Sequence, residues 1–176
     1  MEPIRQADVV TLDHVSRVAE ARRTARRASE RLGLPEEAMG RAELVAVELA
    51  NNIVQHATGA PQGVTAHVRE ERRPRAAGKL FVSSDPAGAD RPARVQIVAV
   101  DQGPGMASVE RCLQDGFTTR STPGLGLGAV YRLSEQADVF SELGSGTVVS
   151  ALVGSRSEGG YFGEAGQGTA VLSTAL

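Results

Sequence analysis

Two stretches near the N-terminus carry apolar residues at helical spacing. Between Asp13 and Leu32 small and apolar residues alternate with arginines, which predicts an amphipathic helix with an arginine face. Asp13 is placed to cap this helix, and Gly33 ends it before Pro35 opens a second helix over about 36–57. The arginine face has two interpretations, a docking surface or a solvated helix face, and the second is commoner.

The pattern then changes to short extended runs separated by glycine and proline. We predict strands at 63–68, 79–84, 95–100, 137–142 and 147–153, loops at 70–78 and 85–94, a helix at 129–136, and a hairpin turn at Gly144-Ser145-Gly146. The order is helices, then strands, then a helix and a hairpin. This order favours an α+β fold with a mixed sheet covered by helices on one face, and argues against a doubly wound parallel sheet.

Length and charge narrow the class of protein. The 176 residues suit one domain, which we place at 1–153, with 154–176 as a tail rich in glycine and serine and of unknown role. A net charge of -2 gives no general attraction to nucleic acid. Cys112 stands alone, which favours a reducing compartment, and no apolar run suits a bilayer. We therefore expect a cytoplasmic protein without nucleic-acid or membrane partners.

Three polar residues interrupt the second predicted helix. Glu48, Asn52 and His56 follow one another at a spacing of four, so they lie on one stripe of the helix. A carboxylate and an amide oxygen placed in this way can hold a magnesium ion and an attacking hydroxyl beside a triphosphate. Taken alone, the stripe is more often a solvated helix face, where most Glu and Asn residues lie.

A second motif directly follows the strand at 95–100. It consists of Asp101, Gln102, Gly103, Pro104, Gly105 and Met106. A carboxylate at a strand end can accept a hydrogen bond from the adenine amine, while the glycines let the backbone turn tightly beside a flat base. The ordinary alternative is a plain Gly-Pro turn after a strand.

Two further glycine motifs follow along the chain. The first stands at the entry to the predicted helix, where backbone amides favour phosphate, and contains Gly124, Leu125, Gly126, Leu127 and Gly128. The second is the hairpin turn, which places the Thr147 hydroxyl where a water could link it to Asp101 and adenine. A flexible loop and a simple hairpin are the ordinary alternatives. The chain lacks a P-loop, a dinucleotide fingerprint and the motifs of eukaryotic-type protein kinases.

The four boxes E-L-x-x-N, D-x-G-x-G, G-x-G-x-G and G-x-G-T, in this order, resemble the GHKL ATPase family of gyrase, histidine kinases and MutL. The resemblance covers about 14–153. Within the family, the stretches AELVAVELANNIVQHATG, VDQGPGM and DGFTTRSTPGLGLGAVYRLSEQADVFSELGSGTVVSA are similar to the small RsbT-type switch kinases and their anti-sigma-factor relatives. The resemblance implies a Bergerat-type two-layer α/β sandwich, mostly antiparallel, that binds ATP and Mg²⁺.

The resemblance also implies roles for individual residues. Glu48 would be the catalytic base, Asn52 the magnesium ligand and Asp101 the adenine ligand, with 107–123 as a lid over the phosphates. The implied ATP-binding set is Asn52, His56, Asp101, Gly103, Gly105, Met106, Gly124, Leu125, Gly126, Leu127, Gly128 and Thr147, together with Thr118, Thr119 and Arg120 of the lid.

These motifs lead to a functional hypothesis. The three histidines do not lie in a phosphoacceptor helix, and we expect a stand-alone nucleotide domain that acts on a separate protein. The resemblance implies a serine/threonine protein kinase that phosphorylates a STAS-domain antagonist in bacterial stress or sigma-factor signalling. Two alternatives stay open: an anti-sigma factor that sequesters a sigma factor, and an activator that switches on a phosphatase or cyclase. The sequence leaves a monomer or a homodimer open, and the long segment 70–94 bears on partner identity.

Overall fold

The computed structural model describes residues 7–56, 78–88, 91–109 and 126–155. The helices are a short 3₁₀ helix η1 and the α-helices α1, α2 and α4, which span Val15–Arg17, Val18–Arg31, Glu36–His56 and Gly126–Leu133. The strands β1 to β5 span Ala7–Leu12, Gly78–Asp85, Arg94–Asp101, Gln136–Glu142 and Gly146–Gly154. The predicted strand at 63–68 and the lid beyond Val109 lie outside the described ranges.

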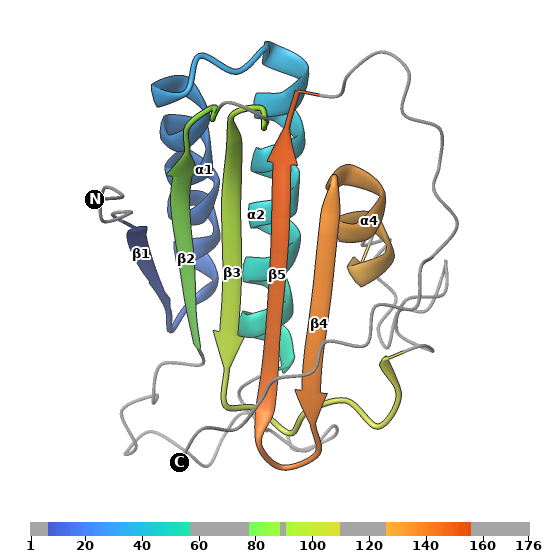
Figure 1. The fold of residues 1–176 in the computed structure, drawn as a ribbon. Coiled ribbons are helices and arrows are strands. Elements are labelled where there is room, and N and C mark those ends of the chain that lie inside the picture. The colour runs from blue at the N-terminus through green and yellow to red at the C-terminus, as the bar shows by residue number, and fades with distance from the viewer. Residues whose placement is uncertain (1–6, 57–77, 89–90, 110–125, 156–176) are drawn as a thin grey trace, which may run out of the picture.

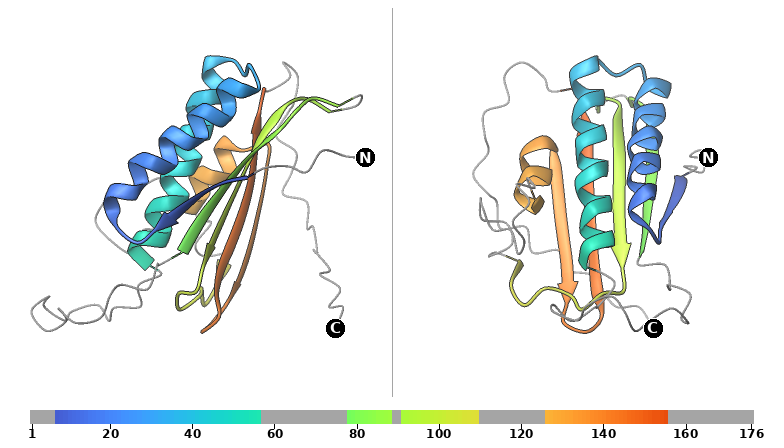
Figure 2. Two further views of the ribbon diagram at one scale, coloured as in Figure 1. Left: turned by 90° about the vertical axis from the view of Figure 1, so that its left-hand side faces the viewer. Right: turned by 180° about the vertical axis from the view of Figure 1, so that it is seen from behind.

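The architecture is a two-layer α/β sandwich. One five-stranded sheet has the order β1-β2-β3-β5-β4, and each described strand pair is antiparallel. Helices α1 and α2 lie side by side against one face of the sheet, and α4 lies beside α2 over β4 and β5 (Figures 1 and 2). The predicted α+β fold with helices on one face is therefore confirmed.

Among the described helices, none combines the length and the apolar character that a membrane-spanning helix needs.

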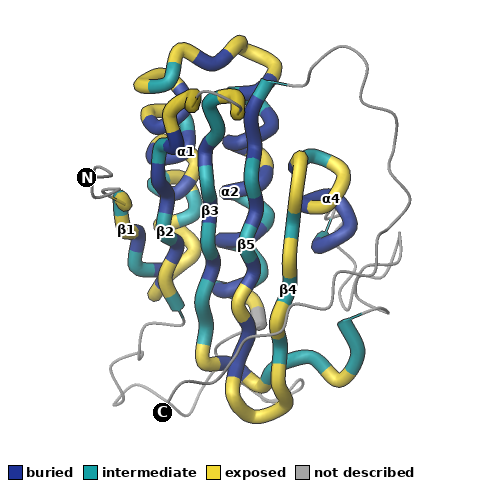
Figure 3. Tube along the Cα trace, viewed as in Figure 1, coloured by how far each residue is buried: buried dark blue, intermediate teal, exposed yellow. Residues whose placement is uncertain are grey.

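The core lies between the sheet and the two long helices. Buried and part-buried positions alternate along most of β3 (Figure 3). Val95 and Ile97 are two of its fully buried residues, and they face the helical layer. From the other side α2 buries Val45, Leu49 and Ile53. Each fully buried aliphatic side chain of this kind stabilises the fold by about 1.5–3 kcal/mol. This packing fixes the rotation of α2 over the sheet.

Several sequence-based boundaries were wrong. Strand β1 precedes the helices and was not predicted, because it is short and, among the described strands, lies at the edge of the sheet beside β2. Asp13 does not cap a helix, because the chain first forms η1, whose N-cap is His14. The Asp13 Oδ1 instead lies 3.5 Å from the Arg17 Nε. The helix predicted at 129–136 spans Gly126–Leu133, because Gln136 already pairs with β5 as the first residue of β4.

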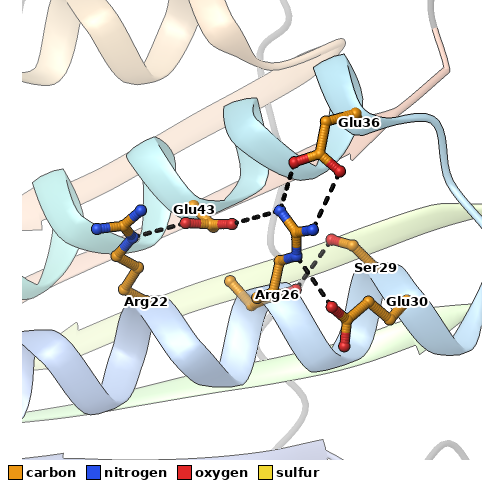
Figure 4. A network of polar contacts seen from close by, with 7 residues as sticks. Arg22, Arg26, Ser29, Glu30, Glu36 and Glu43 are labelled. Carbon is orange, nitrogen blue, oxygen red and sulfur yellow. Dashed lines mark hydrogen bonds and ion pairs between the residues drawn. The ribbon is translucent and has the colours of Figure 1, made fainter.

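Two arginines on the arginine face of α1 contact α2. Arg22 donates to Glu43 at 2.6 Å, and Arg26 donates to Glu43 at 3.1 Å and to Glu36 at 2.6 and 3.0 Å (Figure 4). Arg26 also holds Glu30 on its own helix at 3.0 Å. Both guanidinium groups therefore join α1 to α2, while the Arg22 side chain stays 65% exposed to solvent.

The stability of α2 can be tested at Gly40. A methyl group added at this helical position would meet no atom within 4 Å apart from its chain neighbours and the backbone of the adjacent helical turns. Because glycine in a helix interior is destabilising relative to alanine, Gly40→Ala should raise the free energy of unfolding by about 0.5–1 kcal/mol in urea denaturation. Gly78→Ala is the matched control and should destabilise, since its methyl group would collide with the Val100 carbonyl and lie 2.9 Å from Ile53. A less stable Gly40→Ala protein would contradict the described helix.

The network between α1 and α2 predicts a dependence of stability on pH. Burial raises the pKa of Glu43, but hydrogen bonds from Arg22 and Arg26 together outweigh it and hold the pKa below its usual value. A lowered pKa in the folded state stabilises the fold above the unfolded-state pKa, and this contribution is lost as the pH falls through the folded-state value.

Glu43→Gln should therefore cost about 1 kcal/mol of unfolding free energy at neutral pH, where solvent screens the exposed ends of the arginines. The difference from the parent protein should shrink as the pH falls below the range in which glutamate ionises. Denaturant titrations at several pH values measure both effects. Glu30→Gln, whose side chain is 51% exposed, should have a smaller effect, and an equal loss in the two variants would count against a network centred on Glu43.

Candidate functional site

Strand register gathers polar residues into one row at the end of the sheet. Asp101 on β3 lies opposite Thr147 on β5 and opposite Gly78 on β2, and Thr147 lies opposite Ser141 on β4. Val149, two positions after Thr147, is buried on the face that the helices cover. Because side chains alternate along a strand, Asp101, Thr147 and Ser141 also lie on that face. We call these three residues and Gly78 the polar row.

Two glycines allow the loop after β3 to pack directly on the hairpin. Gly105 has a φ of 69°, and a side chain there would collide with the carbonyl of Glu142. Gly146 has a φ of 113°, and a side chain there would collide with the carbonyl of Asp101. Only glycine permits both the positive φ and the close approach. The loop after β3 and the β4–β5 hairpin therefore meet backbone to backbone.

Hydrogen bonds hold this loop in place. The Gly103 N–H donates to Asp101 Oδ1 at 2.8 Å, which orients the half-buried carboxylate at the end of β3. The Met106 N–H donates to Ser141 Oγ at 2.9 Å, and the Gly144 N–H donates to the Pro104 carbonyl at 2.9 Å. A flat base beside Asp101 would thus meet a loop whose backbone is already positioned.

Helix α2 brings Glu48 to the start of α4. The Glu48 carboxylate is half-buried and accepts a hydrogen bond from the backbone N–H of Gly126, the first residue of α4. Burial raises the pKa of Glu48; the Gly126 hydrogen bond opposes this, and the pKa stays above its usual value. Asn52 lies one turn further along α2 and is also half-buried. The fold therefore brings Glu48 together with Gly126 of the glycine run.

The remaining predicted residues divide into two groups. Thr118, Thr119, Arg120, Gly124 and Leu125 lie outside the described residues, as does the side chain of His56, the last residue of α2. Leu127 and Gly128 are buried in the first turn of α4, and Leu127 is only 5% exposed within the core. The Leu127 side chain therefore serves packing, and its contribution to a ligand would come from its backbone.

Two residues of the polar row, Ser141 and Gly78, were not predicted from the sequence. Gly78 was assigned to a loop, but it is the first residue of β2, and Ile53 of α2 fills the space where its side chain would lie. Ser141 could have been found by counting outward from the hairpin turn, because Glu142 pairs with Gly146 and Ser141 with Thr147. Neither residue type carries a chemical signal without this register.

The side chains of the described residues can be compared with the ligands that a magnesium ion requires. They contain no group of three or more His, Cys, Asp or Glu side chains that could hold a metal. Magnesium bound with a nucleotide does not need such a group, because it keeps several waters and takes its other oxygens from phosphates and one or two side chains. Asn52, one turn from Glu48, fits this kind of partial coordination.

Comparison with known proteins identifies the family of this chain. The family described as the histidine kinase-like ATPase domain matches residues 12–152. A stretch of 58 residues is 38% identical to the serine/threonine-protein kinase RsbT of Bacillus subtilis (strain 168), and it covers 33% of this chain and 44% of that protein. The chain thus matches less than half the length of this curated relative.

Two solved structures are also similar. A crystal structure of RsbU and RsbW domains from Mycobacterium tuberculosis has a TM-score of 0.52 at 16% identity, covering 86% of this chain and 33% of that chain. A mycobacterial sensor histidine kinase, MprB, has a TM-score of 0.44 at 16% identity, covering 86% of this chain and 97% of that chain. The first of these structures supports the two-layer fold. With the family match over most of its length, the chain belongs to the histidine kinase-like ATPase family, as its four boxes predicted.

Proposed function

We propose that this protein is an ATP- and Mg²⁺-dependent serine/threonine protein kinase of the partner-switching type. Its substrate would be a STAS-domain antagonist protein in bacterial stress or sigma-factor signalling. The observation that carries this proposal is the half-buried carboxylate of Glu48, which accepts a hydrogen bond from the first amide of α4. Family membership supports ATP as the nucleotide, and the partial match to RsbT supports the kinase reaction.

The two ends of the nucleotide have separate places in this proposal. The base would lie beside the polar row, where the Asp101 carboxylate can accept a hydrogen bond from the adenine amine. The phosphates would extend toward the start of α4, because the backbone N–H groups of a helix N-terminus and the helix dipole favour negative charge. Helix α2 packs against both β3 and α4, so it runs along the whole length of this site.

Glu48 would act on the hydroxyl of the protein substrate. Its carboxylate would take the hydroxyl proton as the oxygen attacks the γ-phosphorus, and ADP would leave with the bridging oxygen. The raised pKa of Glu48 makes it a stronger base than an exposed glutamate, provided that it is ionised. Asn52 would hold a magnesium ion, whose charge would stabilise the phosphate oxygens.

Replacing Glu48 tests the kinase proposal. Glu48→Gln keeps the size and polarity of the side chain but removes the base, so phosphoryl transfer should fall by about 10²-fold or more. Transfer is measured with labelled ATP and a STAS-domain protein encoded beside the gene. Asn52→Ala should also reduce transfer. Glu37→Gln is the matched control, since Glu37 is 79% exposed in the first turn of α2 and should leave transfer unchanged.

Thermal melting separates loss of chemistry from loss of fold. The pKa of Glu48 is raised in the folded state, so folding favours the protonated carboxyl group. The stability that this group contributes is therefore present below the unfolded-state pKa and is lost as the pH rises through the folded-state pKa. The neutral Glu48→Gln variant should therefore melt at the same temperature as the parent protein or higher at pH 7. A stable complex with a STAS protein that gains no label would indicate that this protein acts by binding. Full phosphoryl transfer by both Glu48→Gln and Asn52→Ala would refute the roles proposed for Glu48 and Asn52.

A further inference from the structure

The hydroxyl of Ser141 makes three contacts, and their directions can be assigned. It receives the Met106 N–H at 2.9 Å, lies 3.1 Å from the Gly146 carbonyl, and lies 2.9 Å from the Thr147 hydroxyl. A hydroxyl has one hydrogen to donate and two lone pairs that accept. A carbonyl can only accept, so the Ser141 hydrogen goes to Gly146. Either hydroxyl could donate in the contact between Ser141 and Thr147, and for all three contacts to be hydrogen bonds the donor there is Thr147.

This assignment determines what Thr147 can offer to a ligand. Its single hydrogen is used on Ser141, so only lone pairs remain for any further hydrogen bond. Thr147 is 8% exposed, which leaves little water to compete for that hydrogen. Directly opposite in the register lies Asp101, whose carboxylate already accepts from the Gly103 N–H at Oδ1. The centre of the polar row therefore presents acceptors.

We propose that Ser141 is a specificity-determining positioning residue, which holds Thr147 as an acceptor so that the polar row selects a nucleobase carrying an exocyclic amine. This inference rests on the proposed nucleotide site. Adenine places an amine at the edge where guanine has a carbonyl oxygen. Against two acceptors the amine donates hydrogen bonds directly, whereas the guanine carbonyl in the same position faces lone pairs with no hydrogen between them.

The same hydroxyl also determines where the base can lie. Through Met106 it fixes the loop after β3, and through Gly146 and Thr147 it fixes the hairpin. Loss of Ser141 would thus have two effects with different signatures. A looser loop would weaken all nucleotides alike, whereas a freed Thr147 hydrogen would change the ratio of ATP to GTP affinity.

Competition binding against a fluorescent ATP analogue tests this inference. The parent protein should prefer ATP to GTP, and Ser141→Ala should reduce that preference by about tenfold, the effect of one hydrogen bond that changes direction. Thr147→Val, which keeps the shape but removes the acceptor, should lower ATP affinity and leave GTP affinity little changed. Thr147→Ser should retain the preference. Ser150→Ala is the matched control, because Ser150 lies half-buried on β5 with the opposite strand parity to Thr147, and it should change neither affinity.

The outcomes separate the inference from the function on which it rests. If Ser141→Ala melts like the parent protein and keeps the full preference for ATP, the role of Ser141 is refuted while the nucleotide site stands. If Ser141→Ala does not fold, the two Thr147 variants provide the test. The inference is refuted if Thr147→Val prefers ATP over GTP by the same factor as Thr147→Ser. A parent protein that binds no ATP would refute the proposed function itself.

Discussion

The antiparallel pairing of Asp101 with Thr147 is the constraint on which the site depends. The same alternation that buries Ile97 and Val149 under the helices places Asp101 and Thr147 on that face at the end of the sheet. A shift of one residue between β3 and β5 would expose the apolar side chains and turn the polar ones away from the helices. Core packing therefore enforces the register, and the register positions the candidate adenine ligands.

Three glycines, Gly78, Gly105 and Gly146, allow the segments around this register to pack closely together. At Gly105 and Gly146 the backbones of two separate segments come closer than any side chain allows, and at Gly78 the absent side chain leaves room for Ile53 of α2. The loop after β3, the hairpin and the end of α2 thus meet around one row of residues. About one turn before Ile53 in α2, Glu48 contacts the start of α4. One helix therefore links the proposed base pocket to the proposed phosphate site.

The long, strongly patterned elements were predictable from the sequence. Helix α2 and the four strands after it follow apolar periodicity, and the hairpin follows its glycine turn. Strand β1 was missed because a six-residue edge strand has too few buried positions to establish a period. The Asp13 cap failed because a local 3₁₀ turn capped by His14 begins first.

The candidate site was predictable as a set of residues but not as an arrangement. Glu48, Asn52 and Asp101 stand out because polar residues interrupt or end apolar segments. The contact of Glu48 with Gly126 depends on how α2 packs against α4, which no local pattern contains. Ser141 was missed because a serine on a strand is ordinary until the hairpin register places it beside Thr147.

The central claim is that the polar row and the start of α4 form one nucleotide site. Hydrogen–deuterium exchange with and without a non-hydrolysable ATP analogue and Mg²⁺ tests it most directly. The account predicts slower exchange of backbone amides in two separate segments, the loop from Gly103 to Met106 and the first turn of α4 at Gly126. Saturating nucleotide that protects neither segment, or protects only the edge strand β1, would contradict it.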